Sequence, residues 1–237
     1  MQSSSKKIAS LIDKAIFDYK MISDGDAILI GASGGKDSTA LVEYFSNRAK
    51  RKNERVRYKA IFVQSDFAAP FPRELEKKFS DWNVDFEKIN VDVLARLKAG
   101  KKMNCWWCST QRRSALLEYA VKNHFNKLAL AHHLDDTLET LFMNMLSKAE
   151  LSTMLPFFAY EKYPLALIRP LVYVSLKQLQ NYAIEKKWAS LTCTCNYQEN
   201  SDRKKARDIV RYITNDNDDA RMKIFHAVEQ VAIRNSQ

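Results

Sequence analysis

Short apolar segments alternate with amphipathic helical segments over much of the chain, and this alternation limits the fold more than any other feature. Predicted strands cover residues 27–31, 58–63, 84–89 and 127–131. Predicted helices cover residues 39–45, 72–82, 113–123 and 137–146. Strands that are each followed by a helix are typical of a parallel sheet covered on both faces. We therefore predict an α/β fold built on a doubly wound parallel sheet with helices on both faces.

Polar clusters follow three of the predicted strands. They are the segment from Ala32 to Ser38, the tripeptide Gln64-Ser65-Asp66, and the run His132-His133-Leu134-Asp135-Asp136. Open α/β sheets bind their ligands beyond the carboxyl ends of the strands. We therefore expect these three clusters to meet in one functional site.

The remaining segments are predicted to be helical. An amphipathic helix is expected at residues 5–20, and further helices after Pro170 at 175–187, 203–213 and 219–234. This change of pattern predicts a catalytic α/β domain at residues 1–170 and a helical C-terminal region at 171–237. All five glycines lie at or before Gly100, so we expect no glycine-built ligand loop in the C-terminal region.

The composition is strongly basic, with 38 Lys+Arg against 28 Asp+Glu and a net charge of +10. A basic balance favours a polyanionic partner such as nucleic acid, but it is also compatible with a well-solvated surface. No apolar run reaches the roughly 18 residues of a membrane-spanning helix, and no signal sequence is recognisable. We therefore expect a cytoplasmic protein with no membrane partner. Its four cysteines are then expected to be thiols or metal ligands.

The segment Ser33-Gly34-Gly35-Lys36-Asp37-Ser38 has the features of a phosphate-binding loop. The two glycines remove side chains where backbone amides must approach a phosphate, and the following helix directs its positive end at that anion. It is not a Walker A motif, because Asp37 stands where that motif has Ser or Thr. The plainer alternative is a Gly-Gly turn capped by Asp37 or Ser38.

The complete string after an apolar strand resembles the PP-loop of the ATP pyrophosphatase superfamily, whose fold is adenine nucleotide alpha hydrolase-like. The resemblance implies ATP binding, adenylation of a carbonyl oxygen and release of pyrophosphate. It also implies Mg²⁺ beside Asp37, because like charges there require a cation. The nucleotide-binding residues that it implies are Ala32, Ser33, Gly34, Gly35, Lys36, Asp37, Ser38 and Asp136.

Two further stretches resemble the TtcA-like tRNA 2-thiocytidine synthetases and their 2-thiouridine relatives. One is Cys105-Trp106-Trp107-Cys108 followed by Arg112-Arg113, and the other runs from Leu130 to Met145. Arg169-Pro170-Leu171 matches the tripeptide that follows the last strand in this family. In this family two cysteines of the CxxC bind an iron–sulfur cluster. A third ligand is expected at Cys195, with Cys193 as the alternative.

The resemblance implies ATP-dependent tRNA thiolation: adenylation of the O2 of a pyrimidine in tRNA, with cytidine as the expected target, and replacement of that oxygen by sulfur. Cys105, Cys108 and Cys195 would hold a [4Fe-4S] cluster and leave one iron open for sulfide. Asp37, Asp66 and Arg112 are the implied catalytic residues. The implied partners are tRNA, a sulfur donor such as a cysteine desulfurase or another sulfide or persulfide source, and a second copy of the chain in a homodimer.

Three other functions share parts of these motifs. A tRNA-lysidine synthetase uses the same loop with lysine in place of sulfur and needs no CxxC. A non-catalytic tRNA- or zinc-binding module would retain only the fold, and a small-molecule enzyme would use the same parts without tRNA. Basic residues beside the proposed cluster ligands favour a phosphate backbone at the site. Trp106 and Trp107 are expected either to stack on a base or to shield the cluster from water.

The basic run from Arg48 to Lys59 is a separate feature of the sequence. It holds seven Lys or Arg residues opposed only by Glu54. We interpret it as a solvated face, which is the usual role of such a run.

Overall fold

A parallel sheet forms the centre of the molecule, in a computed structural model that describes residues 4–51, 54–97, 100, 102–188 and 202–234. Among these residues the strands are β1 (Ala27–Gly31), β2 (Arg57–Ser65), β3 (Phe86–Val91), β4 (Lys127–Ala129), β5 (Phe157–Ala159) and β6 (Ala166–Ile168). Their spatial order is β3-β2-β1-β4-β6-β5. All pairings are parallel except that of β5 with β6. The predicted fold class is confirmed, and the antiparallel edge strand is an addition to it.

The order of the strands explains why β1 reads as a continuous apolar run. β1 pairs with β2 on one side and with β4 on the other. Ile28, Leu29 and Ile30 are each at most 1% exposed. A strand buried on both faces does not alternate between apolar and polar residues. The strand before the glycine-rich loop is therefore the rigid centre of the sheet.

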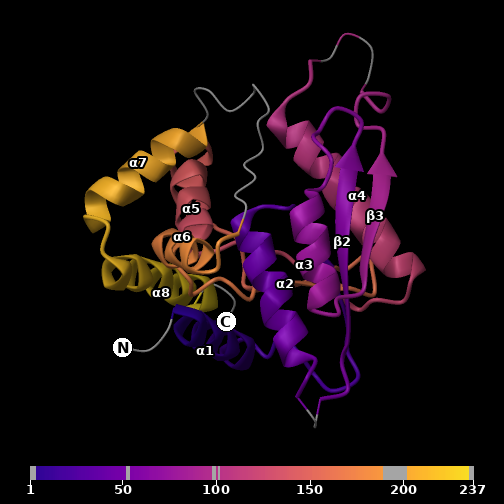
Figure 1. Cartoon of the computed structure of the whole chain (residues 1–237). Helices are drawn as coiled ribbons and strands as arrows, with labels where there is room; N and C mark the ends of the chain where they lie inside the picture. Colours follow the sequence, from indigo (N-terminus) through magenta and orange to yellow (C-terminus); the bar gives the residue numbers. More distant parts are fainter. Residues whose placement is uncertain (1–3, 52–53, 98–99, 101, 189–201, 235–237) are drawn as a thin grey trace.

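The helices in the described part of the chain match the predicted ones closely. They are α1 (Ser4–Asp18), α2 (Lys36–Arg48), α3 (Arg73–Asp81), α4 (Cys105–Lys122), α5 (Leu134–Lys148), α6 (Leu176–Glu185), α7 (Asp202–Thr214) and α8 (Asp218–Arg234). In Figure 1, α2 and α3 lie beside the sheet, and α5 to α8 gather next to α1. No helix among the described residues has the length and apolar character needed to cross a membrane.

Three helices, α2, α4 and α5, begin at least three residues earlier than predicted, and side-chain caps explain the early starts of α4 and α5. α4 starts at Cys105 instead of Arg113, because the Asn104 side chain accepts a hydrogen bond from the Trp107 amide at 2.8 Å. α5 starts at Leu134, because His133 and Asp136 form a reciprocal capping box. These caps place the CxxC on the first turn of α4 and the pair Asp135-Asp136 on the first turn of α5.

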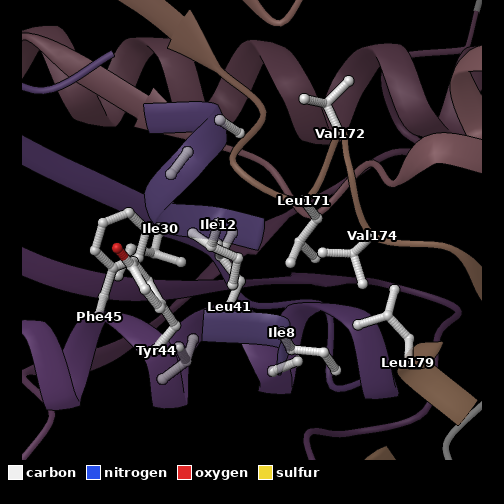
Figure 2. Packing of buried hydrophobic residues seen from close by; sticks show 14 of the residues in the cluster. Ile8, Ile12, Ile30, Leu41, Tyr44, Phe45, Leu171, Val172, Val174 and Leu179 are labelled. Atoms are coloured by element: carbon white, nitrogen blue, oxygen red, sulfur yellow. The ribbon is translucent and has the colours of Figure 1, made fainter. Parts of the chain in front are cut away.

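The hydrophobic core on one face of the sheet joins the two ends of the chain. Figure 2 shows Ile8 and Ile12 of α1 near Leu41 of α2, with Leu171 and Val174 from the segment after β6. A smaller core on the other face packs α4 against the sheet. The domain boundary at residue 170 stays a prediction, since side chains from both sides of it share the larger core.

The basic run at residues 48–59 is largely paired within the molecule. Arg51 lies 3.1 Å from Asp13, Arg55 lies 2.8 Å from Asp24, and Lys59 lies 3.2 Å from Asp85. β2 begins at Arg57, so the run lies toward the amino ends of the strands and away from the glycine-rich loop. The interpretation of the run as a solvated face holds for Arg51 and Arg55, whose side chains are exposed, but not for Lys59, whose side chain is 19% exposed.

Candidate active site

The glycine-rich loop joins the end of β1 to the start of α2. Gly34 has a φ of +82°, a left-handed conformation that other residues adopt at a cost. The Ser38 hydroxyl donates to the Gly35 carbonyl at 3.0 Å and accepts from the Ser33 amide at 3.1 Å. These bonds fold the loop back on the first turn of α2.

The N-terminus of α2 is available to an anion. Its N-cap is Gly35, which has no side chain to cap the first helical amides, and the Gly35 amide itself donates only a long hydrogen bond of 3.4 Å to Ser33 Oγ. The first amides of a helix that lack a partner attract phosphate, and the helix dipole adds to this attraction. Lys36 contributes a cation at the same place. The loop thus has the donors that a polyphosphate requires.

Asp37 has a carboxylate oxygen suited to a cation. Its Oδ2 lies 3.1 Å from Lys36 Nζ, whereas its Oδ1 is buried with no hydrogen-bond partner among the described residues. A buried carboxylate oxygen is costly unless it is paired, and hard cations such as Mg²⁺ prefer oxygen ligands. Asp37 therefore fits a magnesium ion shared with a bound polyphosphate.

A cavity of ≈ 200 Å³ opens at the carboxyl ends of the strands. Its walls come from β1 and the glycine-rich loop, β2, α4 and the segment after β4, and they consist of Gly31, Ala32, Ser33, Ile61, Val63, Ser109, Arg112, Arg113, Leu116, Leu130 and His132. Gly31 leaves room at this wall, because a Cβ there would lie 2.8 Å from the end of the Leu130 side chain, which would have to shift. The predicted residues Ala32, Ser33 and Arg112 are brought together here, and none of the described residues that line the cavity is acidic.

Asp136 lies next to this cavity instead of in its lining. Its carboxylate accepts from the His133 amide at 3.1 Å, and Arg203 of α7 lies 3.8 Å away. Burial raises the pKa of Asp136, but the neighbouring His133, His132 and Arg203 outweigh it and leave the pKa below its usual value. Asp136 is therefore a carboxylate one turn into α5.

The CxxC forms the first turn of α4, with Cys105 as the first residue of the helix. Cys108 is half-buried and packs against the smaller core together with Trp107. The Trp107 indole donates to the Val93 carbonyl at 3.2 Å, whereas Trp106 is 71% exposed. Trp107 is thus a packing residue, whereas Trp106 has its ring on the surface, so stacking of a base is still a prediction for Trp106 alone. Cys193 and Cys195 lie outside the described residues.

A profile of the family described as PP-loop domain matches residues 2–213 of the chain. The chain belongs to the PP-loop family. A tRNA-cytidine(32) 2-sulfurtransferase from Variovorax paradoxus is 34% identical over 87% of this chain and 68% of its own length. A protein of the same name from Pseudomonas putida is 32% identical over 96% of this chain and 84% of its own length.

Solved structures place the PP-loop chain in the same fold. The U34-tRNA thiolase NcsA from Methanococcus maripaludis, solved with its [4Fe-4S] cluster, has a TM-score of 0.76 at 19% identity. The match covers 95% of this chain and 78% of that one. NMN synthetase from Francisella tularensis has a TM-score of 0.55 at 14% identity, over 87% of this chain and 84% of that one. At these identities the likeness concerns the fold.

Asp66 has a structural contact in this PP-loop protein. Its two carboxylate oxygens accept from the amides of Val93 at 3.2 Å and Leu94 at 2.9 Å, so it fastens the turn after β3 to the end of β2. It does not line the ≈ 200 Å³ cavity. Its contact with adenosine or with the reacting atoms stays a prediction.

Arg169 and Glu139 are site neighbours for which the sequence predicted no role. Arg169 was recognised only as part of a motif, yet its side chain contacts His132 of the cavity. Glu139 is 2% exposed. Its carboxylate accepts a hydrogen bond from Arg207 of α7 at 2.7 Å and forms an ion pair with Arg203 at 3.7 Å. Both contacts join segments far apart in the chain, so no local pattern reveals them.

Glu139→Gln is expected to lower the free energy of unfolding by about 2 kcal/mol, because two arginines of α7 lose their buried carboxylate. Urea unfolding followed by circular dichroism measures this change. Asp208→Asn, an exposed acid on α7, is the control and should stay within about 0.5 kcal/mol of the wild type. Equal stability of the two variants would contradict the role of Glu139 in docking α7.

Proposed function

We propose that this PP-loop chain is a tRNA thiolase that replaces O2 of the cytidine at position 32 with sulfur and converts ATP to AMP and pyrophosphate. One observation carries the proposal. Ser33 of the PP-loop lines the same cavity as Ser109 and Arg112, which follow the CxxC on α4. ATP bound at the loop and a sulfur carrier bound at the cysteines would therefore face one substrate atom. The sulfurtransferase names of the relatives support the choice of substrate.

The first step requires the chain to hold ATP and to expose its α-phosphate. The loop amides and Lys36 would bind the phosphates, and Asp37 would share Mg²⁺ with them. The cytidine O2 attacks the α-phosphorus while the bond to the β-phosphate oxygen breaks, so pyrophosphate leaves. Arg112 lies in the cavity wall where it can neutralise the developing charge.

The second step requires sulfur at C2 of the adenylated base. Cys105, Cys108 and Cys195 would hold a [4Fe-4S] cluster, which when bound supplies the sulfur nucleophile. Thiolates are soft ligands that suit iron–sulfur clusters, and two of the three cysteines share the first turn of α4. The C2–O2 bond then breaks, and O2 leaves as part of AMP.

The tRNA would approach the carboxyl ends of the strands. Exposed Trp106 offers a stacking surface beside the cavity, and Lys204 and Lys205 are exposed on the first turn of α7. Because the proposed substrate is a tRNA, we propose that the reaction takes place in the cytoplasm. A cysteine desulfurase or another sulfide or persulfide source would reload the site, and a homodimer would be the active assembly.

The test is mass spectrometry of tRNA nucleosides from bacteria that lack their own cytidine-32 thiolase and carry this chain on a plasmid. We expect 2-thiocytidine to return with the wild-type chain and to stay absent with the empty plasmid. A restored 2-thiouridine would move the chain to the other branch of thiolases. Unchanged thionucleosides would overturn the proposal, and lysidine in the same digest would then test the ligase alternative.

A further inference from the structure

A buried arginine holds one of the two neighbouring histidines in a defined orientation. Arg169 Nε donates to His132 Nδ1 at 3.2 Å, and a second nitrogen of the same guanidinium donates to the Leu155 carbonyl. Arg169 is 6% exposed, and the acceptors of these two hydrogen bonds are an imidazole nitrogen and a backbone carbonyl. The arginine therefore serves the histidine and the backbone instead of an acid.

This contact fixes the protonation of the imidazole. Nδ1 accepts a hydrogen bond, so in the neutral ring the proton is on Nε2 and that nitrogen is a donor. Burial lowers the pKa of His132 to about 4. Asp136 opposes this shift, whereas Arg169, Arg113 and Arg203 add to it. His132 is thus a neutral donor at physiological pH.

The donor belongs to a wall of the cavity that is rich in positive charge. His132 lines the cavity with Ser33, Arg112 and Arg113. Burial and the neighbouring Arg113 lower the pKa of Arg169 to about 10, so its guanidinium stays charged at neutral pH. The described part of the cavity wall thus presents hydrogen-bond donors and cations but no acidic residue. Such a wall forms a site for an anion in a region of low dielectric constant.

The neighbouring His133 shows what a structural histidine looks like in the same segment. It is 5% exposed, and its Nδ1 accepts from the Asp136 amide at 3.3 Å as the N-cap of α5. It does not line the ≈ 200 Å³ cavity. The two adjacent histidines therefore have different functions, one at the helix cap and one at the cavity.

We propose that His132 is a catalytic hydrogen-bond donor whose Nε2–H binds a non-bridging oxygen of the α-phosphate during AMP transfer, and that Arg169 is a positioning residue that fixes this donor. The inference rests on the proposed adenylation. Negative charge grows on that oxygen as O2 of the base bonds to the α-phosphorus and pyrophosphate leaves. A neutral donor stabilises this charge and gives up no proton, so the step needs no further acid or base.

The experiment is tRNA-dependent exchange of labelled pyrophosphate into ATP by the cluster-loaded protein without a sulfur source. His132→Gln keeps an N–H close to the position of Nε2, whereas the shorter amide of His132→Asn does not reach it. We expect His132→Asn to lose about 10²–10³-fold in exchange rate, as for removal of one oxyanion donor, with the KM for ATP little changed. His132→Gln should retain activity within about tenfold of the wild type.

Arg169→Met tests the positioning role by the ¹⁵N NMR spectrum of the His132 ring. In the wild type Nδ1 should resonate as an unprotonated nitrogen and Nε2 as a protonated one. In the variant both nitrogens should show mixed signals, together with a slower exchange of pyrophosphate. An unchanged spectrum would contradict the role of Arg169.

The outcomes separate this inference from the proposed function. Wild-type protein that shows no tRNA-dependent exchange would overturn the adenylation itself. Wild-type exchange with an equally active His132→Asn variant would leave the adenylation intact and sink the role of His132. Equal loss in the Gln and Asn variants would show that the imidazole acts by something other than its Nε2 donor.

Discussion

Cys108→Ser is expected to reduce tRNA thiolation at least about 100-fold and to remove most of the bound iron. Mutation of a residue that only hydrogen-bonds to a metal ligand already lowers metal affinity or activity by about 10–100-fold. Loss of a ligand itself should therefore have an effect at or above this range. Cys108 lies one turn into α4 and is half-buried, and a serine of similar size should not disturb the helix. Anaerobic iron analysis, the visible spectrum and 2-thiocytidine formation give the three readouts.

The same measurement on the other cysteines identifies the third ligand. Cys195→Ser is expected to behave like Cys108→Ser, while Cys193→Ser serves as the matched control and should retain iron and activity. If Cys193→Ser loses iron and activity while Cys195→Ser retains both, Cys193 is the third ligand. Full activity of Cys108→Ser with no iron lost would contradict the cluster assignment, and stoichiometric zinc in the wild type would favour the binding-module alternative.

Lys36→Met is expected to lower tRNA-dependent pyrophosphate exchange about 10²–10³-fold while the iron content stays that of the wild type. Lys36 is the cation of the PP-loop at the start of α2, and the charge that develops on the phosphates would lose this partner. Lys36→Arg keeps the charge but not its compact shape, so we expect an intermediate rate. Lys36→Met is thus expected to fail in adenylation, whereas Cys108→Ser is expected to fail in sulfur transfer.

A lysine far from the site provides the control for Lys36. Lys14 of α1 is exposed and pairs with Asp18 on the same helix. Lys14→Met should keep the wild-type exchange rate and KM for ATP. An exchange rate for Lys36→Met within about threefold of Lys14→Met would contradict the placement of ATP on the glycine-rich loop.

The fold could be predicted from the sequence where apolar periodicity was strong. The runs at residues 27–31 and 127–131 mark central strands, and three predicted polar clusters do follow the carboxyl ends of strands. β5 and β6 were not predicted: each has three residues, and, unlike the equally short β4, neither was marked as an apolar run between predicted helices. The early start of α4 depends on the Asn104 cap, which an apolar pattern does not register.

The site could be predicted only as far as local motifs extend. Ala32 and Ser33 of the first predicted cluster and His132 of the third meet in the cavity, because parallel strands end at one edge of the sheet. The cluster Gln64-Ser65-Asp66 does not line this cavity, and Arg112 reaches it from α4. The contact between His132 and Arg169 joins residues 37 positions apart and depends on the pairing of β4 with β6. No local spacing gives that neighbourhood. The roles assigned to Asp37, Asp66, Asp136 and the cysteines stay predictions.

The central claim is that O2 of cytidine 32 is adenylated and leaves in AMP. The most direct test uses a synthetic anticodon stem-loop with ¹⁸O at O2 of that cytidine and measures the mass of the AMP formed with 2-thiocytidine. The account predicts one ¹⁸O in each AMP, in equal amount to the thionucleoside. Unlabelled AMP alongside 2-thiocytidine would show that O2 never bonds to the α-phosphorus, and the account would be wrong.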